Sequence, residues 1–239
     1  LVTSPRQKAM LRHIARYALT LRPVLDSLFY QGQSNGCESD LSQLRANKLI
    51  TAVENAVADP VDPHSRYSFY QLTKAGAKSI GASEYRGKAL GGQAVARYLA
   101  FLWFCCIKRP RRHRIGLAQL TQVFGEEILA ESCDKKRELL LPGFHCLDKT
   151  ETSYRVLHLY APKTSVGDTA TEIRKRLREA RRLAVIDQAI SDGQYAIAVL
   201  AETTQQRDSL RAHLGKSFAD DPVSIVVAVS PGPWKRNRA

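Results

Sequence analysis

Five polar side chains lie close together between residues 42 and 48, within the segment ESDLSQLRANKLI, which runs from Glu38 to Ile50. Apolar residues at positions 41, 44, 49 and 50 supply the buried edge of a short helix, so the polar residues fall on its other side. Hydroxyl, amide and cationic groups of this kind read base edges and contact phosphates. The segment is therefore predicted to contain a DNA-recognition helix over residues 39–49 that uses Ser42, Gln43, Arg45, Asn47 and Lys48.

Neighbouring segments supply the other elements of a winged helix-turn-helix. Ser4 as a cap and Pro5 at the first helical position predict a helix over residues 4–19, and Pro23 opens a second one. Residues 51–57 and 67–72 then read as two strands of a wing, followed by a helix from residue 73. At the wing, Arg66 is placed to reach a minor groove or a phosphate, and a solvated loop arginine is an equally good interpretation.

The charge of the chain favours a polyanionic partner. The formal net charge is +13. A cut after Leu120 leaves 18 Lys and Arg against 7 Asp and Glu in the first part, and 18 against 16 in the rest. Such an excess suits phosphate backbones through counterion release, and it also suits anionic membrane surfaces.

The sequence KRPRRHR, residues 108–114, carries five positive charges in seven residues. Pro110 prevents helix continuation, so the run is either a solvated loop or a nonspecific phosphate clamp. Because it follows a DNA-reading module, the clamp is favoured. The predicted phosphate contacts are Lys108, Arg109, Arg111, Arg112 and Arg114.

Membrane, redox and metal chemistry find little support in the sequence. The most apolar run, residues 98–107, is about half of the roughly 20 residues that a spanning helix needs. The first residues lack an apolar stretch of signal-peptide length, which predicts a cytoplasmic protein. Five cysteines without a Cys-x-x-Cys pair indicate reduced thiols, and the dispersed histidines predict no metal site and no cofactor.

The second half of the chain has the pattern of a small α/β domain. Apolar runs at residues 139–148, 154–160, 196–200 and 223–229 predict strands, the last of them fully buried. Helices are predicted over residues 168–191 and 203–214, which makes part of the sheet parallel. The expected organisation is a DNA-binding domain at 1–82, a linker at 83–92, an α/β domain at 93–232 and a basic tail at 233–239.

Two blocks, QLTKAGAKSIG and GGQAVARYLAFLWF, together with the later strands, resemble the replication-relaxation family of plasmid and integrative-element proteins. The resemblance implies a winged helix-turn-helix followed by a domain similar to the PD-(D/E)xK nuclease fold, α/β in class and α+β overall. That nuclease chemistry needs two acids and a lysine around Mg²⁺. After Pro142 the chain has Gly143 in place of the aspartate, residues 158–161 hold no carboxylate, and Lys163 lies near the place of the lysine.

These departures predict a noncatalytic second domain. The expected function is sequence-specific binding of double-stranded DNA on a mobile genetic element, as a homodimer, in transcription regulation or as an accessory factor in plasmid replication or conjugative transfer. One alternative is a Mg²⁺-dependent nuclease or nicking enzyme using Asp148 and Glu151, and another is a protein-interaction adaptor. Arginines at 174, 178, 181 and 182 share a helix side that would extend a phosphate track, pair with an acidic partner subunit, or stay solvated.

Overall fold

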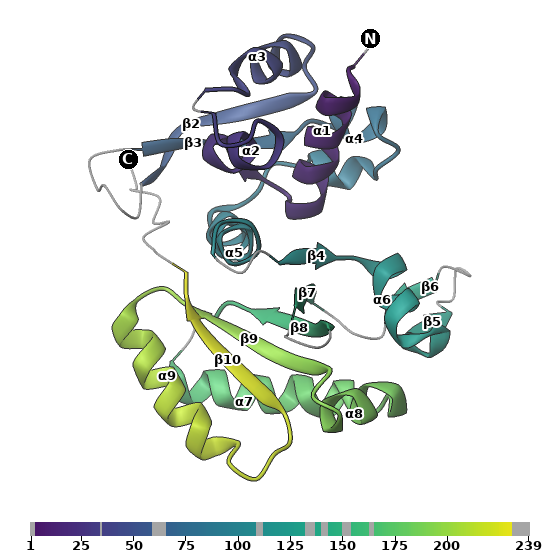
Figure 1. The fold of residues 1–239 in the computed structure, drawn as a ribbon, viewed down its shortest axis with the longest axis vertical. Helices are drawn as coiled ribbons and strands as arrows, with labels where there is room; N and C mark the ends of the chain where they lie inside the picture. Colours follow the sequence, from purple (N-terminus) through teal and green to yellow (C-terminus); the bar gives the residue numbers. More distant parts are fainter. Residues whose placement is uncertain are drawn as a thin grey trace. The chain divides into compact units, whose positions relative to one another are not determined.

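The computed structural model describes residues 3–33, 35–58, 66–108, 112–131, 137–139, 143–149, 154–162 and 165–230. These residues form two compact units, one ending at Trp103 and one running from Phe104 to Ser230 (Figure 1). Both units contain helices and strands, which confirms the expected α/β class. No helix in these ranges is long and apolar enough to cross a membrane.

The first unit combines helices with a three-stranded antiparallel sheet. Its strands lie in the order β1-β3-β2, with Thr20 opposite Tyr70 and Ile50 opposite Leu72. The short strand β1 is an addition to the elements predicted from the sequence. The elements are α1 (Pro5–Tyr17), β1 (Thr20–Leu21), α2 (Arg22–Phe29), α3 (Glu38–Ala46), β2 (Ile50–Ala58), β3 (Arg66–Leu72), α4 (Lys74–Ser79), the 3₁₀ turn η1 (Glu84–Gly87) and α5 (Gly92–Leu102).

Apolar side chains of α1, α3 and the sheet form the core of the first unit. At the start of α1, the Gln7 N–H donates to Ser4 Oγ, and the Ser4 N–H donates to Gln7 Oε1, both at 3.1 Å. This reciprocal cap fixes where the helix begins and therefore which of its residues face inward. The core includes Met10, Leu11, Ile14, Leu41, Leu44, Leu49, Ile50 and Leu72.

The segment 83–92, expected to be a linker, belongs to the first unit. It contains η1, which contacts α4 and β3. A Cβ at Gly87 would lie 2.3 Å from the backbone nitrogen of Lys74, so only glycine permits this approach of the two backbones. The next helix, α5, contacts α1 and also belongs to this unit, which moves the domain boundary from the predicted residue 93 to residue 103.

The second unit is built on a five-stranded sheet in the order β10-β9-β8-β7-β4. Strands β8, β9 and β10 are parallel to one another, as expected for strands joined by helical crossovers. Strand β7 pairs antiparallel with β8, and β4 pairs antiparallel with β7. After the π-helical turn η2 (Trp103–Ile107), its elements are β4 (His113–Ile115), α6 (Leu117–Phe124), η3 (Glu126–Ile128), β5 (Leu129–Glu131), β6 (Arg137–Leu139), β7 (Phe144–Lys149), β8 (Tyr154–Tyr160), α7 (Val166–Ala180), α8 (Ala184–Ser191), β9 (Tyr195–Ala201), α9 (Thr204–Ser217) and β10 (Ser224–Val229).

Helices α6 to α9 and the sheet share one apolar core. It contains Ile173 and Leu177 of α7, Ile186 of α8 and Leu210 of α9, packed with residues of β8 and β9. Two predictions need correction. The single helix expected over residues 168–191 is two helices with a break at 181–183. Strand β10 is a half-buried edge strand, because β9 is its only partner among the described strands.

A close approach of two backbones fixes the turn between α3 and β2. The Thr73 N–H donates to the Leu49 carbonyl at 3.0 Å, and Thr73 Oγ1 donates to the Lys48 carbonyl at 2.6 Å. A Cβ at Gly76 would lie 1.9 Å from the Leu49 carbonyl oxygen. Helix α4 is therefore docked on the turn that follows α3, and a residue larger than glycine would displace it.

We predict that Gly76→Ala lowers the free energy of unfolding of the first unit by about 1 to 3 kcal/mol, because the new methyl group overlaps a backbone carbonyl. Gly92→Ala is the matched control, since its Cβ meets no atom within 4 Å. Urea unfolding followed by circular dichroism measures both variants. Equal stability of the two variants would show that α4 is not held against Leu49.

Candidate nucleic-acid interface

Helix α3 has one buried side and one exposed side. Leu41 and Leu44 are 3% and 0% exposed, and they pack with the core of the first unit. Ser42, Gln43 and Arg45 are exposed. The predicted division of this helix into an apolar and a polar side is confirmed, and the polar side is available to a ligand.

The helix ends earlier than the sequence predicts, at Ala46 rather than residue 49. Asn47 is the C-cap, and Lys48 adopts a left-handed backbone with φ 55° that closes the helix. Asn47 is therefore half-buried in the turn, whereas the Lys48 side chain is exposed. The five predicted recognition residues stay together, three on the helix and two on the turn after it.

Two of these side chains already have partners within the unit. Gln7 Nε2 donates to Gln43 Oε1 at 2.6 Å, which orients the Gln43 amide. An Arg45 Nη2 lies 3.2 Å from Glu54 Oε1 on β2, and both side chains are more than half exposed. An exposed ion pair of this kind contributes little stability, so the Arg45 guanidinium can exchange Glu54 for a ligand at low cost.

A hollow of about 560 Å³ lies between α2 and β3. Arg66, exposed at the start of β3, lines it together with Arg22, Asp26 and Tyr70. Arg22 also pairs with Glu38 at the start of α3, at 2.6 Å. Sequence reasoning missed Arg22, because only the fold brings the first residue of α2 beside the first residue of α3.

The predicted phosphate clamp at residues 108–114 is not supported for two of its arginines. The Arg112 side chain is 8% exposed, pairs with Asp148 at 2.7 Å and covers the Phe104 ring. Arg114 is 7% exposed and covers the Phe144 ring at 4.5 Å. A planar guanidinium stacks on aromatic rings and pairs with carboxylates inside proteins. Both residues are therefore removed from the predicted interface.

Of the other three residues of that run, the structure describes only Lys108. Arg109 and Arg111 lie outside the described residues. Lys108 is half-buried, and burial together with the nearby positive charges of Arg112, Arg207 and Arg211 lowers the pKa of its ammonium group. A phosphate at Lys108 would relieve this repulsion.

Asp148, the acid of the alternative nuclease prediction, is engaged on both oxygens. Arg112 faces Oδ1, and Arg155 donates to Oδ2 from Nε at 3.2 Å and from Nη2 at 3.1 Å. A divalent cation there would meet two fixed positive charges. Pro142, Glu151 and Lys163 lie outside the described residues. Among the residues that are described, no three His, Cys, Asp or Glu side chains are grouped to hold a metal ion.

A buried polar network crosses the sheet of the second unit instead. The Tyr195 hydroxyl lies 3.3 Å from His145 Nε2 and 3.3 Å from His158 Nδ1. Burial, reinforced by the Arg176 charge, lowers the pKa of His158 to about 4. Burial also lowers the pKa of His145 well below its usual value. Both rings are neutral near pH 7, so the network joins β7, β8 and β9 without charge.

No protein-family model, no curated protein and no solved structure matches the chain. The resemblance to the replication-relaxation family therefore stays a prediction.

The neutral histidines predict an acid-sensitive second unit. The unfolded chain binds a proton at His158 near pH 6.5 and the folded chain only near pH 4, so the free energy of unfolding falls as pH drops between these values. At about 1.4 kcal/mol per pKa unit, the loss is on the order of 3 kcal/mol.

Urea unfolding at pH 7 and pH 4.5 tests this, with His158→Gln expected to show a smaller pH dependence than the unaltered chain. The exposed His213 on α9 provides a control, and His213→Gln should retain the full pH dependence. A pH dependence of stability that survives in His158→Gln and vanishes in His213→Gln would show that His158 is not the source of the acid sensitivity.

Proposed function

We propose that the first unit is a winged helix-turn-helix that binds double-stranded DNA, with the exposed side of α3 in the major groove. The observation that carries the proposal is the exposed polar side of α3 next to the β2–β3 hairpin, on a helix whose other side is buried. The order α1-β1-α2-α3-β2-β3, with β1 paired to β3, supports it. So do the positive charges of Arg45, Lys48 and Arg66 around that surface.

The acidic residues of α3 are compatible with this role because both are bound by other residues of the unit. Glu38 pairs with Arg22. Asp40 accepts hydrogen bonds from Gln7 Nε2 at 2.9 Å and from the Tyr30 hydroxyl. Glu38 is therefore paired with a cation, Asp40 is held by neutral donors, and the exposed positive charges of α3 and the turn after it are Arg45 and Lys48.

Net charge is weaker support than the sequence suggested. With the structural boundary after Trp103, residues 1–103 hold 13 Lys and Arg against 7 Asp and Glu, and residues 104–230 hold 20 against 16. The excess is thus shared between the units, because the run at 108–114 belongs to the second one. The proposal therefore depends on where charges are exposed rather than on a basic first half.

Within this proposal, sequence-specific binding would serve transcription regulation, or plasmid replication or transfer as the family resemblance implies. Binding as a homodimer to a repeated site remains part of the expectation. An adaptor that does not touch DNA would show no salt-dependent affinity for duplex DNA, whereas a binder loses affinity steeply as salt rises.

We predict that Arg45→Ala and Asn47→Ala each weaken binding to a selected duplex by about 1 to 3 kcal/mol while leaving binding to random duplex nearly unchanged. The reason is that contacts to base edges discriminate between sequences and phosphate contacts do not. Selection of bound fragments supplies the site, and mobility shifts give the affinities.

Lys78→Ala is the control, because Lys78 is exposed on α4, outside the proposed recognition surface. If Arg45→Ala and Asn47→Ala bind the selected site as tightly as Lys78→Ala does, then α3 is not the recognition helix.

A further inference from the structure

Helix α7 and the turn after it carry six positive side chains, and the fold neutralises two of them. Arg176 pairs with Glu172 at 3.0 Å, one turn before it on the helix. Arg181 pairs with Asp221 and, at 3.4 Å, with Asp187. The four that remain are Arg174, Lys175, Arg178 and Arg182.

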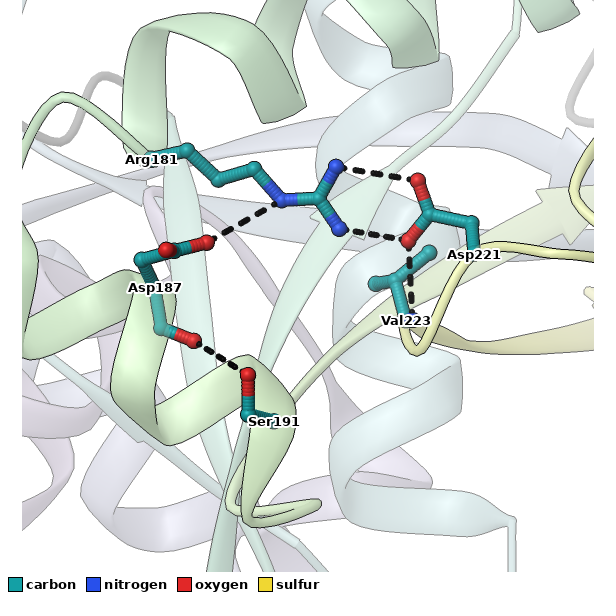
Figure 2. A network of polar contacts seen from close by, with 5 residues as sticks. All are labelled: Arg181, Asp187, Ser191, Asp221 and Val223. Carbon is teal, nitrogen blue, oxygen red and sulfur yellow. Dashed lines mark hydrogen bonds and ion pairs between the residues drawn. The ribbon is translucent and has the colours of Figure 1, made fainter.

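Arg181 anchors the loop between α9 and β10 on the end of α7, as Figure 2 shows. Its Nη1 donates to Asp221 Oδ2 at 2.9 Å and its Nη2 to Oδ1 at 2.5 Å, and Oδ1 also accepts the Val223 N–H at 2.9 Å. The hydrogen bonds from Arg181 lower the pKa of Asp221. Asp221 is thus an ionised, fully engaged partner that leaves no negative charge for other arginines.

The anchored loop in turn positions a third arginine. The Arg174 guanidinium lies 5.3 Å from the centre of the Phe218 ring, and its Nη2 donates to the Ser217 carbonyl at 3.3 Å. Neither contact cancels its charge. Arg174 is therefore held in place over α9 while it stays positive.

A hollow of about 350 Å³ opens along this side of α7. Arg174 and Arg178 line it four residues apart, a rise of about 6 Å along α7, and Arg182 lines it from the turn after the helix. Arg178 and Arg182 are exposed, and neither forms an ion pair with any described residue. The paired Arg181 and Asp221 also line this hollow, and the adjoining hollow is lined by three aspartates, at positions 187, 220 and 221.

We propose that the Arg174–Arg178–Arg182 row is a second, sequence-independent binding site for the phosphate backbone of a nucleic acid. A guanidinium group binds phosphate oxygens through two parallel N–H bonds, and a row of three such groups fits a chain of phosphates better than one small anion. Phosphate contacts position a nucleic acid without reading its sequence. The site belongs to the second unit and does not require α3 to be a recognition helix.

The test uses the full chain with Arg178→Gln and Arg182→Gln combined, because these two side chains are exposed and their loss leaves the Arg181 and Arg174 contacts intact. For random-sequence duplex, the slope of log affinity against log salt should become less steep by about 2. Affinity for random and selected duplex should fall by the same factor. The matched control, Lys149→Gln with Lys175→Gln, removes the same charge from exposed positions of the same unit and should leave the slope unchanged.

Arg178→Lys with Arg182→Lys should keep the slope, since lysine also releases counterions. An unchanged slope in the glutamine variant, or an equal change in the control, would overturn the proposal. The proposal would also be overturned if the glutamine variant bound nucleic acid normally and lost only its thermal stabilisation by inorganic phosphate. The same holds if it lost only its binding to phosphatidylserine vesicles. A slope that depends on Arg178 and Arg182 in a protein whose Arg45→Ala variant binds normally would support this site and reject the role proposed for α3.

Discussion

The contact between α4 and the turn at Lys48–Leu49 is the constraint on which the first unit depends. Gly76 brings the α4 backbone onto the Leu49 carbonyl, and Thr73 binds the carbonyls of Lys48 and Leu49. The left-handed backbone of Lys48 is held by these contacts, so α3 ends at Ala46 and β2 begins four residues later. The position of the exposed Lys48 relative to α3 is set at this turn.

Arginine pairing decides which positive charges face solvent in the second unit. Arg112 and Arg155 share Asp148, and Arg114 covers Phe144, so two arginines of the basic run at 108–114, together with Arg155, stabilise the fold. Arg181 joins the end of α7 to a loop forty residues later. Breaking a buried pair would leave an uncompensated charge, which makes such arginines poor candidates for ligand binding and good anchors for the fold. The exposed arginines at 174, 178 and 182 stand out because Arg112, Arg155 and Arg181 are already paired with aspartates.

Local patterns predicted most of the elements correctly. Leucine spacing in α3, the caps at Ser4 and Thr73, and the apolar runs of β8 and β9 are signals carried by a few neighbouring residues. The errors have non-local causes. Strand β1 has two residues and exists because Thr20 and Leu21 pair with β3, and the break after α7 accompanies the bond from Arg181 to Asp221. Of the candidate site, the residues of α3 were predictable, whereas Arg22 was not.

By itself, the sequence determined the mixed α/β class, the buried and exposed sides of α3, and the presence of a parallel sheet near the carboxyl end. These depend on hydrophobic periodicity, which is written into consecutive residues. Only the tertiary structure decided that Arg112 and Arg114 are buried, that Asp148 is enclosed by arginines, and that the row on α7 keeps its charge. The physical reason is that the state of a charged side chain depends on its burial and on the partners around it, and residues distant in sequence supply both.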